Sequence, residues 1–349
     1  MKIIAFYLPQ FHRIPENDQW WGEGFTEWTN TRRAQPLFHR HYQPREPLNN
    51  YYYNLTDPTT RRWQAEIAKK YGIYGFCYYH YWFKGKQLLE RPFNEVLRLG
   101  EPDFPFCLSW ANESWTRTWD GGNNDILIGQ EYGHREDWKK HFDYLLKAFL
   151  DNRYIRINNK PVFLIYRPEL IQHCEEMLNF WNDLAKEAGL DGIYFIRTLN
   201  GFPYVEKNGF DASVEFEPMY TLRHDYLPNP HILDSPYRPM FADYDATWDR
   251  IVSRVPQDKN NNPIIPGAFV DWDNTARLKK NALIYRGATP EKFGKYLSVR
   301  IQRAKSIYNS NYLFINAWNE WAEGTYLEPD KRYGFRYLEE VKKAVEENS

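Results

Sequence analysis

The stretch Tyr312-Leu313-Phe314-Ile315-Asn316-Ala317 runs directly into Trp318-Asn319-Glu320-Trp321-Ala322-Glu323-Gly324-Thr325 near the end of the chain. The apolar run has the length of a buried strand, so it predicts that Glu320 stands where the strand ends and Glu323 in the loop beyond. Two carboxylates among indoles indicate sugar chemistry. A carboxylate pair supplies acid and base for breaking a glycosidic bond, and indole faces bind sugar rings. The alternative interpretation is a core tryptophan pair with solvated loop acids.

Working outward from this stretch, strand-like and helix-like patterns alternate along nearly the whole chain. The predicted strands are Lys2–Leu8, Tyr74–His80, Pro105–Trp110, Pro161–Tyr166, Gly192–Arg197, Ala212–Phe216, Ile265–Val270 and the run from Tyr312. The predicted helices are Pro58–Tyr71, Leu88–Leu99, Arg135–Asp151, Pro168–Ala188, Pro203–Asn208, Tyr244–Val255, one beginning at Thr289-Pro290-Glu291, and Tyr333–Glu347. Eight such pairs predict an α/β fold, a (β/α)8 TIM barrel formed by residues 1–349 as a single domain.

Long strand-to-helix loops are expected over the C-terminal face of the barrel. One follows the first strand and is rich in Trp, Pro and Asn; another covers residues 218–243 and is expected to be functional. The alternative fold is an open doubly wound sheet, as in nucleotide-sugar glycosyltransferases. Against it, Leu8-Pro9-Gln10-Phe11-His12 stands where a phosphate-binding turn needs glycines.

Composition limits the class of partner. The formal net charge is −1, from 45 basic and 46 acidic residues, which gives no electrostatic case for nucleic acid or an anionic membrane. Aromatic residues make up 18% of the chain, more than its core needs, and favour an oligosaccharide or polysaccharide ligand.

The three cysteines are interpreted as reduced core residues. No apolar run reaches membrane-helix length and no signal-peptide cleavage site follows the first strand, so a cytoplasmic protein is expected unless the chain was trimmed. The sequence makes no prediction of oligomeric state.

Polar and aromatic residues close nearly every predicted strand, where the active sites of such barrels lie. The residues expected to bind substrate are Tyr7, Gln10, His12, Trp28, His80, Trp82, Trp110, Asn112, Glu113, Tyr166, Arg197, Glu215, Glu217, Asp271, Trp272, Asp273, Arg277, Trp318 and Trp321. Taken singly, His80 or Arg197 reads equally well as a satisfied buried polar group. The loop from Trp20 to Trp28 adds three indoles and two carboxylates, and its alternative role is to fold over the barrel mouth.

The C-terminal motif from Trp318 to Thr325 resembles the catalytic motif of the endo-α-mannosidase family of glycoside hydrolases, family 99. Over almost its full length the chain more closely resembles WbsX-type proteins, a related group often labelled glycosyltransferases and associated with surface-polysaccharide gene clusters. The motifs that carry this likeness are Ala5-Phe6-Tyr7-Leu8-Pro9-Gln10-Phe11-His12 and Trp272-Asp273-Asn274-Thr275-Ala276-Arg277.

The resemblance implies a (β/α)8 barrel in which Glu320 and Glu323 are the catalytic carboxylates. It implies a retaining reaction in which Glu320 deprotonates the substrate's own 2-hydroxyl and Glu323 serves as acid and then base, with no metal and no cofactor. An α-mannoside is a substrate whose 2-hydroxyl suits this reaction. A desolvated site walled by Trp318 and Trp321 is expected to raise the pKa of the acid.

Two other functions remain open. A glycosyltransferase of lipopolysaccharide or capsule biosynthesis would use an activated sugar donor, and Asp271-Trp272-Asp273 has the spacing of a metal-binding pair for its pyrophosphate. The sequence shows no phosphate cradle beside that pair. A carbohydrate-binding barrel without catalysis is the third reading, although such a protein is expected to lose one of the two acids.

Overall fold

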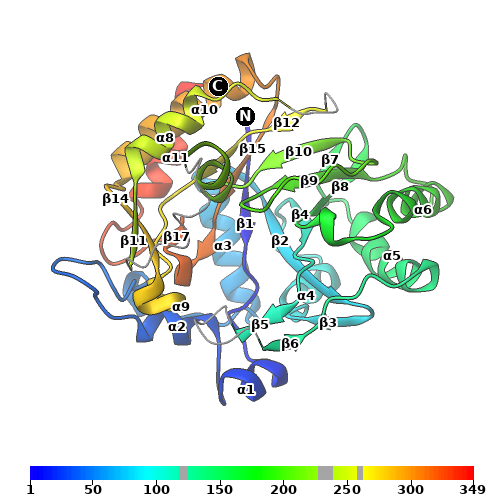
Figure 1. The fold of residues 1–349 in the computed structure, drawn as a ribbon, viewed down its shortest axis with the longest axis horizontal. Coiled ribbons are helices and arrows are strands. Elements are labelled where there is room, and N and C mark those ends of the chain that lie inside the picture. The colour runs from blue at the N-terminus through cyan, green and yellow to red at the C-terminus, as the bar shows by residue number, and fades with distance from the viewer. Residues whose placement is uncertain (118–124, 227–238, 258–261) are drawn as a thin grey trace.

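The computed structural model describes residues 1–117, 125–226, 239–257 and 262–349. Its centre is a nearly closed barrel of nine parallel strand segments (Figure 1). In sheet order they are β12 (Ile264–Ile265), β10 (Ala212–Glu215), β9 (Tyr194–Leu199), β8 (Lys160–Ile165), β4 (Phe106–Trp110), β2 (Ile73–Phe83), β1 (Lys2–Tyr7), β15 (Tyr312–Asn316) and β13 (Gly267–Phe269).

The two ends of this sheet are consecutive in sequence, because only Pro266 separates β12 from β13. β12 pairs with β10 and β13 pairs with β15, so the two segments together serve as the seventh strand of an eight-strand arrangement. Gly267 permits this crossing. A Cβ on Gly267 would lie 1.8 Å from the carbonyl oxygen of Glu215, so only glycine fits. The predicted TIM barrel and its strand segments are confirmed.

Helices surround the barrel, with α5 and α6 on the right of Figure 1 and α8, α10 and α11 at the upper left. Their bounds are α3 (Pro58–Lys70), α4 (Arg91–Leu99), α5 (Arg135–Phe149), α6 (Cys174–Glu187), α8 (Tyr244–Ser253), α10 (Pro290–Ser306) and α11 (Arg336–Glu347). The carboxylate of Asp57 accepts a hydrogen bond of 2.8 Å from the Thr59 amide, as an N-cap does. Thr289 caps α10 in the same way.

The predicted helix at Pro203–Asn208 is wrong, since the segment from 200 to 211 contains no helix. Six residues that begin with a proline offer too few backbone hydrogen bonds to form a helix on their own. The Arg197 side chain instead reaches outward from β9 and donates a hydrogen bond of 2.6 Å to the carbonyl oxygen of Val205. This segment therefore covers the barrel as an extended loop.

Other differences from the prediction lie in the loops. The first loop contains two short helices, and the strand of the second unit continues to Phe83 into a hairpin, which delays α4 by about three residues. The helix predicted from Pro168 begins at Cys174, after one short turn. Of the 218–243 loop, residues 227–238 lie outside the described residues. The remaining elements are α1 (Pro15–Trp21), α2 (Glu27–Arg33), β3 (Lys86–Leu88), β5 (Trp115–Thr116), β6 (Ile126–Ile128), β7 (Arg156–Ile157), α7 (Met219–Thr221), β11 (Met240–Asp243), α9 (Thr275–Leu278), β14 (Leu283–Arg286), β16 (Asn319–Glu320) and β17 (Thr325–Tyr326).

In the described ranges no helix combines the length and the apolar character needed to cross a bilayer. Cys77, Cys107 and Cys174 are buried and form no disulfide. They contribute small apolar volumes to the core.

Two histidines lie in the aromatic layer between β2 and α5. The Nε2 atoms of His80 and His141 are 2.8 Å apart, and the His141 ring stacks on Trp82 with centroids 4.5 Å apart. Burial lowers the pKa of His80 from 6.5 to about 3, and burial, with a smaller contribution from His80, lowers the pKa of His141 well below its usual value. Both rings are therefore neutral in the folded protein at neutral and mildly acidic pH.

This pair predicts a loss of stability in acid. The unfolded chain takes up a proton on each histidine near pH 6.5 and the folded chain does not. The free energy of unfolding should therefore fall between pH 6.5 and about 3, by at most about 1.4 kcal/mol per pH unit per histidine. His80→Gln keeps a hydrogen-bonding group and should show a shallower slope in urea unfolding from pH 7.5 to 4.5. His39→Gln, at an exposed histidine, is the control. Equal slopes in all three proteins would contradict the assignment.

Candidate active site

A short hairpin presents the two motif carboxylates. β16 pairs with β17 in antiparallel register, with Glu320 opposite Thr325, and the turn between them carries Glu323. Asn319 fixes the hairpin to the barrel, because its side chain accepts a hydrogen bond from the Leu8 amide at 2.7 Å and donates one to the Leu8 carbonyl at 3.0 Å. The Asn319 side chain thus continues the sheet from β1, and Glu320 follows immediately at the barrel mouth.

Gly324 closes the turn. Its φ of 68° lies in the left-handed region, and a Cβ there would approach the Asp273 backbone to 2.9 Å. The close approach lets the Asp273 amide donate a hydrogen bond of 2.7 Å to the Glu323 carbonyl oxygen. The loop after the eighth strand is therefore joined to the loop after the seventh.

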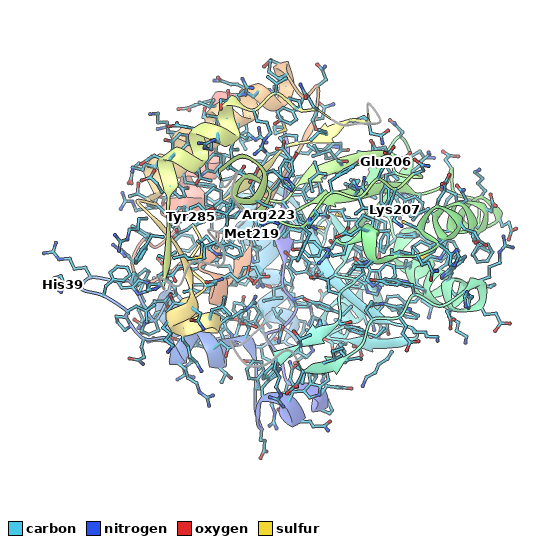
Figure 2. The ribbon with its side chains drawn as sticks, in the orientation of Figure 1. His39, Glu206, Lys207, Met219, Arg223 and Tyr285 are labelled. Atoms are coloured by element: carbon cyan, nitrogen blue, oxygen red, sulfur yellow. The ribbon has the colours of Figure 1, made fainter. Side chains whose placement is uncertain are left out.

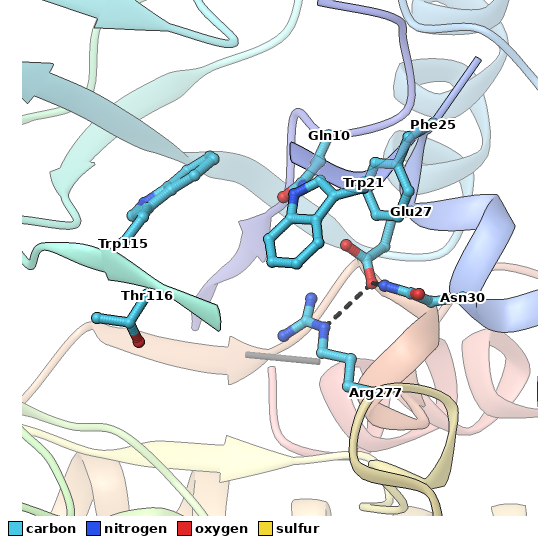
Figure 3. Close-up of a pocket in the computed structure, with 8 residues that line it drawn as sticks. All are labelled: Gln10, Trp21, Phe25, Glu27, Asn30, Trp115, Thr116 and Arg277. Carbon is cyan, nitrogen blue, oxygen red and sulfur yellow. Dashed lines mark hydrogen bonds and ion pairs between the residues drawn. The ribbon is translucent and has the colours of Figure 1, made fainter. Parts of the chain in front are cut away.

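A single guanidinium joins three carboxylates at this point. Arg277 on α9 donates from Nε to Glu27 at 3.0 Å, from Nη2 to Glu320 at 3.1 Å, and from Nη1 to Glu323. Glu27 begins α2, so the three acids come from two loops that are distant in sequence. The dashed line in Figure 3 marks the pair formed by Arg277 and Glu27.

Burial raises the pKa of both motif carboxyls. For Glu320, burial is the largest cause, the negative charge of Glu323 adds to it, and Arg277 opposes it. For Glu323, burial again raises the pKa against the opposing charge of Arg277. Glu320, Glu323 and Glu27 all contact the single cation of Arg277. Glu320 and Glu323 together therefore retain a proton at a higher pH than two ordinary glutamates would. One acid and one base can therefore coexist here.

A cavity of about 250 Å³ opens onto these groups. Of the residues expected to bind substrate, the structure brings Glu113, Tyr166, Trp272 and Arg277 to this cavity together with Glu320 and Glu323. Its other walls are Leu8, Tyr79, Tyr81, Ala111, Trp115, Phe216 and Met219. Figure 2 labels Met219, from α7, near the middle of the view. Glu113 pairs with Arg167, and its pKa is raised by burial against the charge of that arginine.

The structure does not bring the other expected residues to this cavity. Gln10 lines the next cavity, beside Arg277. The remaining expected residues are buried, either in packing or polar networks or on the side away from the barrel mouth. They are Tyr7, His12, Trp28, His80, Trp82, Trp110, Asn112, Arg197, Glu215, Glu217, Asp271, Asp273, Trp318 and Trp321. Trp318 and Trp321 therefore do not wall the pocket as expected. Tyr79, Tyr81, Trp115 and Trp272 do so instead.

Strand alternation explains the largest group of these differences. Side chains along a strand point alternately to its two faces, so Tyr79 and Tyr81 enter the cavity while His80 and Trp82 face α5. Trp110 lies on the outer face in the same way, with its ring 4.7 Å from that of His141. The aromatic character of β2 on both faces concealed which face is inward.

Several expected site residues form ion pairs or polar contacts that build the scaffold. Glu215 pairs with Arg300 in the core, and Glu217 pairs with Arg254 at 2.8 Å. Asn112 bonds both the amide and the carbonyl of Arg167, at 2.7 and 2.8 Å. Such buried pairs are costly to break, since removing one partner strands the other charge.

Asp271 and Asp273 anchor the segment that precedes the first barrel helix. Asp271 accepts a hydrogen bond from Arg45 at 2.9 Å, and Asp273 is 2.8 Å from both His41 and Gln43. Burial acts to raise the pKa of Asp273, but hydrogen bonds from His41 and Thr275 and the charge of Arg45 outweigh it and lower that pKa to about 2. Within the described ranges no group of three or more His, Cys, Asp or Glu side chains has the geometry to hold a metal ion.

A second buried network lies behind the hairpin and centres on Glu328. Its carboxylate accepts hydrogen bonds from Trp321 Nε1, the Tyr53 hydroxyl and Gln64 Nε2, each at 2.7 Å. Gln64 in turn accepts a hydrogen bond of 2.7 Å from the Tyr7 hydroxyl. Burial raises the pKa of Glu328 to about 7 against these hydrogen bonds. Trp321 and Tyr7 therefore position the hairpin from behind.

Sequence reasoning missed Glu27, Tyr79, Tyr81 and Phe216 as site residues. Glu27 lies in the Trp-rich stretch already singled out, but its contact with Arg277 depends on α2, which was expected to be loop. The pairing of one arginine with three acids has no local sequence pattern. It appears only when the first, seventh and eighth loops meet.

Solved structures share this fold at low sequence identity. An endo-alpha-mannosidase of glycoside hydrolase family 99 from Bacteroides thetaiotaomicron matches with a TM-score of 0.56 and 17% identity over 99% of this chain and 96% of its own. A glycoside hydrolase-like protein matches with a TM-score of 0.63 and 14% identity over 98% and 93%. These matches show a shared barrel fold.

Sequence comparison gives the family. An uncharacterized protein WxcX of Xanthomonas campestris pv. campestris is 36% identical over 348 residues, which cover 98% of this chain and 49% of the relative; a second strain has a similar protein. The chain thus spans about half the length of these relatives. The family model described as "Glycosyltransferase WbsX" matches residues 3–341, and the chain belongs to this family.

Proposed function

We propose that the chain is a retaining glycoside hydrolase that cleaves α-linked glycans, with Glu320 as base and Glu323 as acid and then base. The observation that carries this proposal is the Arg277 guanidinium bound to both acids and to Glu27 in an aromatic-walled cavity. The fold shared with the family 99 endo-alpha-mannosidase supports it. Mannose-type residues, whose 2-hydroxyl can reach the back of the anomeric carbon, are the substrates that fit best.

In the first step Glu320 takes the proton of the substrate's 2-hydroxyl, and that oxygen attacks the anomeric carbon. The bond from the anomeric carbon to the leaving oxygen breaks, and Glu323 gives its proton to that oxygen. In the second step Glu323 takes a proton from water, which opens the anhydro ring, and Glu320 returns its proton to the 2-oxygen. Configuration at the anomeric carbon is retained because it is displaced twice.

Exposure of the two acids fits these roles. Glu320 exposes 6% of its side chain and Glu323 exposes 20%, so Glu323 is the acid that water reaches more easily in the second step. Burial raises the pKa of both carboxyls in the free site, so the pair can hold one proton between them. The mechanism therefore requires the shared proton to lie on Glu323 once a sugar hydroxyl contacts Glu320.

Replacing either acid should abolish most of the activity. Glu320→Gln and Glu323→Gln should each lower kcat/KM for glycan cleavage by ~10²–10⁴-fold, the usual effect of losing an acid or base. An aryl glycoside with an acidic phenol as its leaving group distinguishes the two roles. That leaving group needs no proton, so the Glu323→Gln variant should recover the rate of the first step and the Glu320→Gln variant should not. Glu101→Gln, at an ion-paired glutamate away from the cavity, is the control. Activity within about threefold of wild type in either acid variant would refute the assignment.

The family description favours a second candidate, a glycosyltransferase of surface-polysaccharide assembly. Its donor site would need Asp271 and Asp273 to hold a metal and a pyrophosphate. Both carboxylates are already bound by the 41–45 segment, which a metal would have to displace.

Calorimetry separates the two candidates. We expect nucleotide-sugars with Mn²⁺ to bind no more tightly than nucleotide-sugars with a chelator, because Arg45 and His41 occupy the acids. Tight binding that requires Mn²⁺ and is lost in Asp271→Asn would replace the hydrolase proposal with the transferase.

A further inference from the structure

Three cavities follow one another from the acids across α2 to α9. The catalytic cavity shares Trp115 and Arg277 with a small cavity lined also by Gln10, Trp21 and Glu27. Figure 3 draws this small cavity. It shares Trp21, Phe25, Asn30 and Arg277 with an outer cavity of about 400 Å³. The shared lining residues place the three cavities next to one another, and we call this row of cavities the cleft.

Aromatic rings line the cleft where it leaves the acids. Trp21 packs against Phe25 with ring centroids 5.9 Å apart, and the Arg117 guanidinium lies 5.6 Å from the Trp21 ring. Trp20 and Trp115 are in edge contact at 5.9 Å, which joins α1 to β5. A sugar ring that stacks on Trp21 gains apolar contact without losing its hydroxyls to burial. The cleft has room for sugars beyond the one that is cleaved.

The charge of the lining reverses along this cleft. The catalytic cavity holds Glu113, Glu320 and Glu323 with Arg277 as its one lining cation. The outer cavity is lined by Arg33, Lys279 and Arg277, and none of the described residues lining it is acidic. Arg277 is neutralised by its three carboxylates. Arg33 and Lys279 form no ion pair with any described residue, so their charges are available to a ligand.

The local backbone fixes both cations at this place. Arg33 ends α2, the helix that begins with Glu27, and Lys279 directly follows α9, the helix that carries Arg277. Lys279 has a φ of 53°, a conformation that side chains rarely adopt, and its carbonyl accepts a hydrogen bond from the Ala282 amide at 3.1 Å. The helices that carry Glu27 and Arg277 therefore also position Arg33 and Lys279.

We propose that the substrate is an acidic glycan, and that Arg33 and Lys279 bind a carboxylate or phosphate on a sugar outside the one that is cleaved. The inference rests on the proposed function for the place of the cleaved sugar. A planar guanidinium and an ammonium that line one cavity suit an anionic oxygen group. A neutral sugar leaves both charges without a partner.

Binding to a protein that cannot turn over tests this directly. In the Glu323→Gln background, calorimetry is done with an α-linked uronic acid oligomer, the same oligomer with its carboxyls reduced to alcohols, and a phosphorylated α-mannose oligomer. At low salt at least one acidic oligomer should bind more tightly than the reduced oligomer. Arg33→Gln and Lys279→Gln should each weaken that binding by about two- to fivefold, the usual effect of an exposed ion pair, and leave the reduced oligomer unaffected. The preference should diminish as salt rises.

The neighbouring cations give matched controls. Arg32 and Lys280 are exposed, adjacent in sequence and outside the outer cavity, so Arg32→Gln and Lys280→Gln should leave every affinity unchanged. Trp21→Ala should weaken acidic and reduced oligomers alike, because stacking does not depend on charge. The acidic oligomer that binds more tightly shows whether the site prefers a carboxylate or a phosphate.

The inference is overturned if acidic and reduced oligomers bind equally, if neither acidic oligomer binds, or if the preference survives in the Arg33→Gln, Lys279→Gln double variant. These outcomes are independent of turnover. A protein that prefers acidic oligomers and cleaves none of them contradicts the proposed function and leaves this inference intact. A protein that cleaves neutral glycans without preferring acidic ones contradicts this inference alone.

Discussion

Everything at the barrel mouth depends on the Arg277 guanidinium, which contacts Glu27, Glu320 and Glu323 together. Burying three carboxylates beside one another is unfavourable unless a cation compensates them. One arginine for three acids compensates only in part, which is why the pKa of both motif carboxyls stays raised. Because the positive charge does not balance the three carboxylates, the pair of motif carboxyls retains a proton. Acid and base catalysis would depend on this shared proton.

Arg277 owes its own position to contacts outside the cavity. Asp273 accepts hydrogen bonds from the amide and hydroxyl of Thr275 at 3.1 and 2.5 Å, and so fixes the start of α9. His41 and Gln43 hold the other oxygen of that carboxylate. The Asp273 amide then bonds the turn that carries Glu323. Asp273, which has the sequence spacing of a metal ligand, thus connects the loop after the seventh strand to the loop after the eighth.

The barrel was predictable because its strands are buried on both faces and therefore form continuous apolar runs, as Tyr312 to Asn316 does. The two motif carboxylates and Arg277 were predictable as candidates from motif residues near strand ends. The walls of the cavity were not, because β2 is aromatic on both faces and only the register of the closed sheet decides that Tyr79 and Tyr81 point inward. Glu27 was missed because α2 forms through packing against the eighth loop, as the 5.3 Å contact between the rings of Trp28 and Trp321 shows.

The most direct test of this account is a crystal structure of the protein soaked with a cationic iminosugar of mannose configuration. The account predicts that the ring lies between Tyr81, Tyr166 and the carboxylates of Glu320 and Glu323, with its ammonium within about 3.5 Å of one of those carboxylates. It predicts further that Arg277 keeps its contact with Glu27. An empty cavity, or an inhibitor bound beside Asp271 and Asp273 instead, would contradict the claim that the arginine-bound acids are the reaction centre.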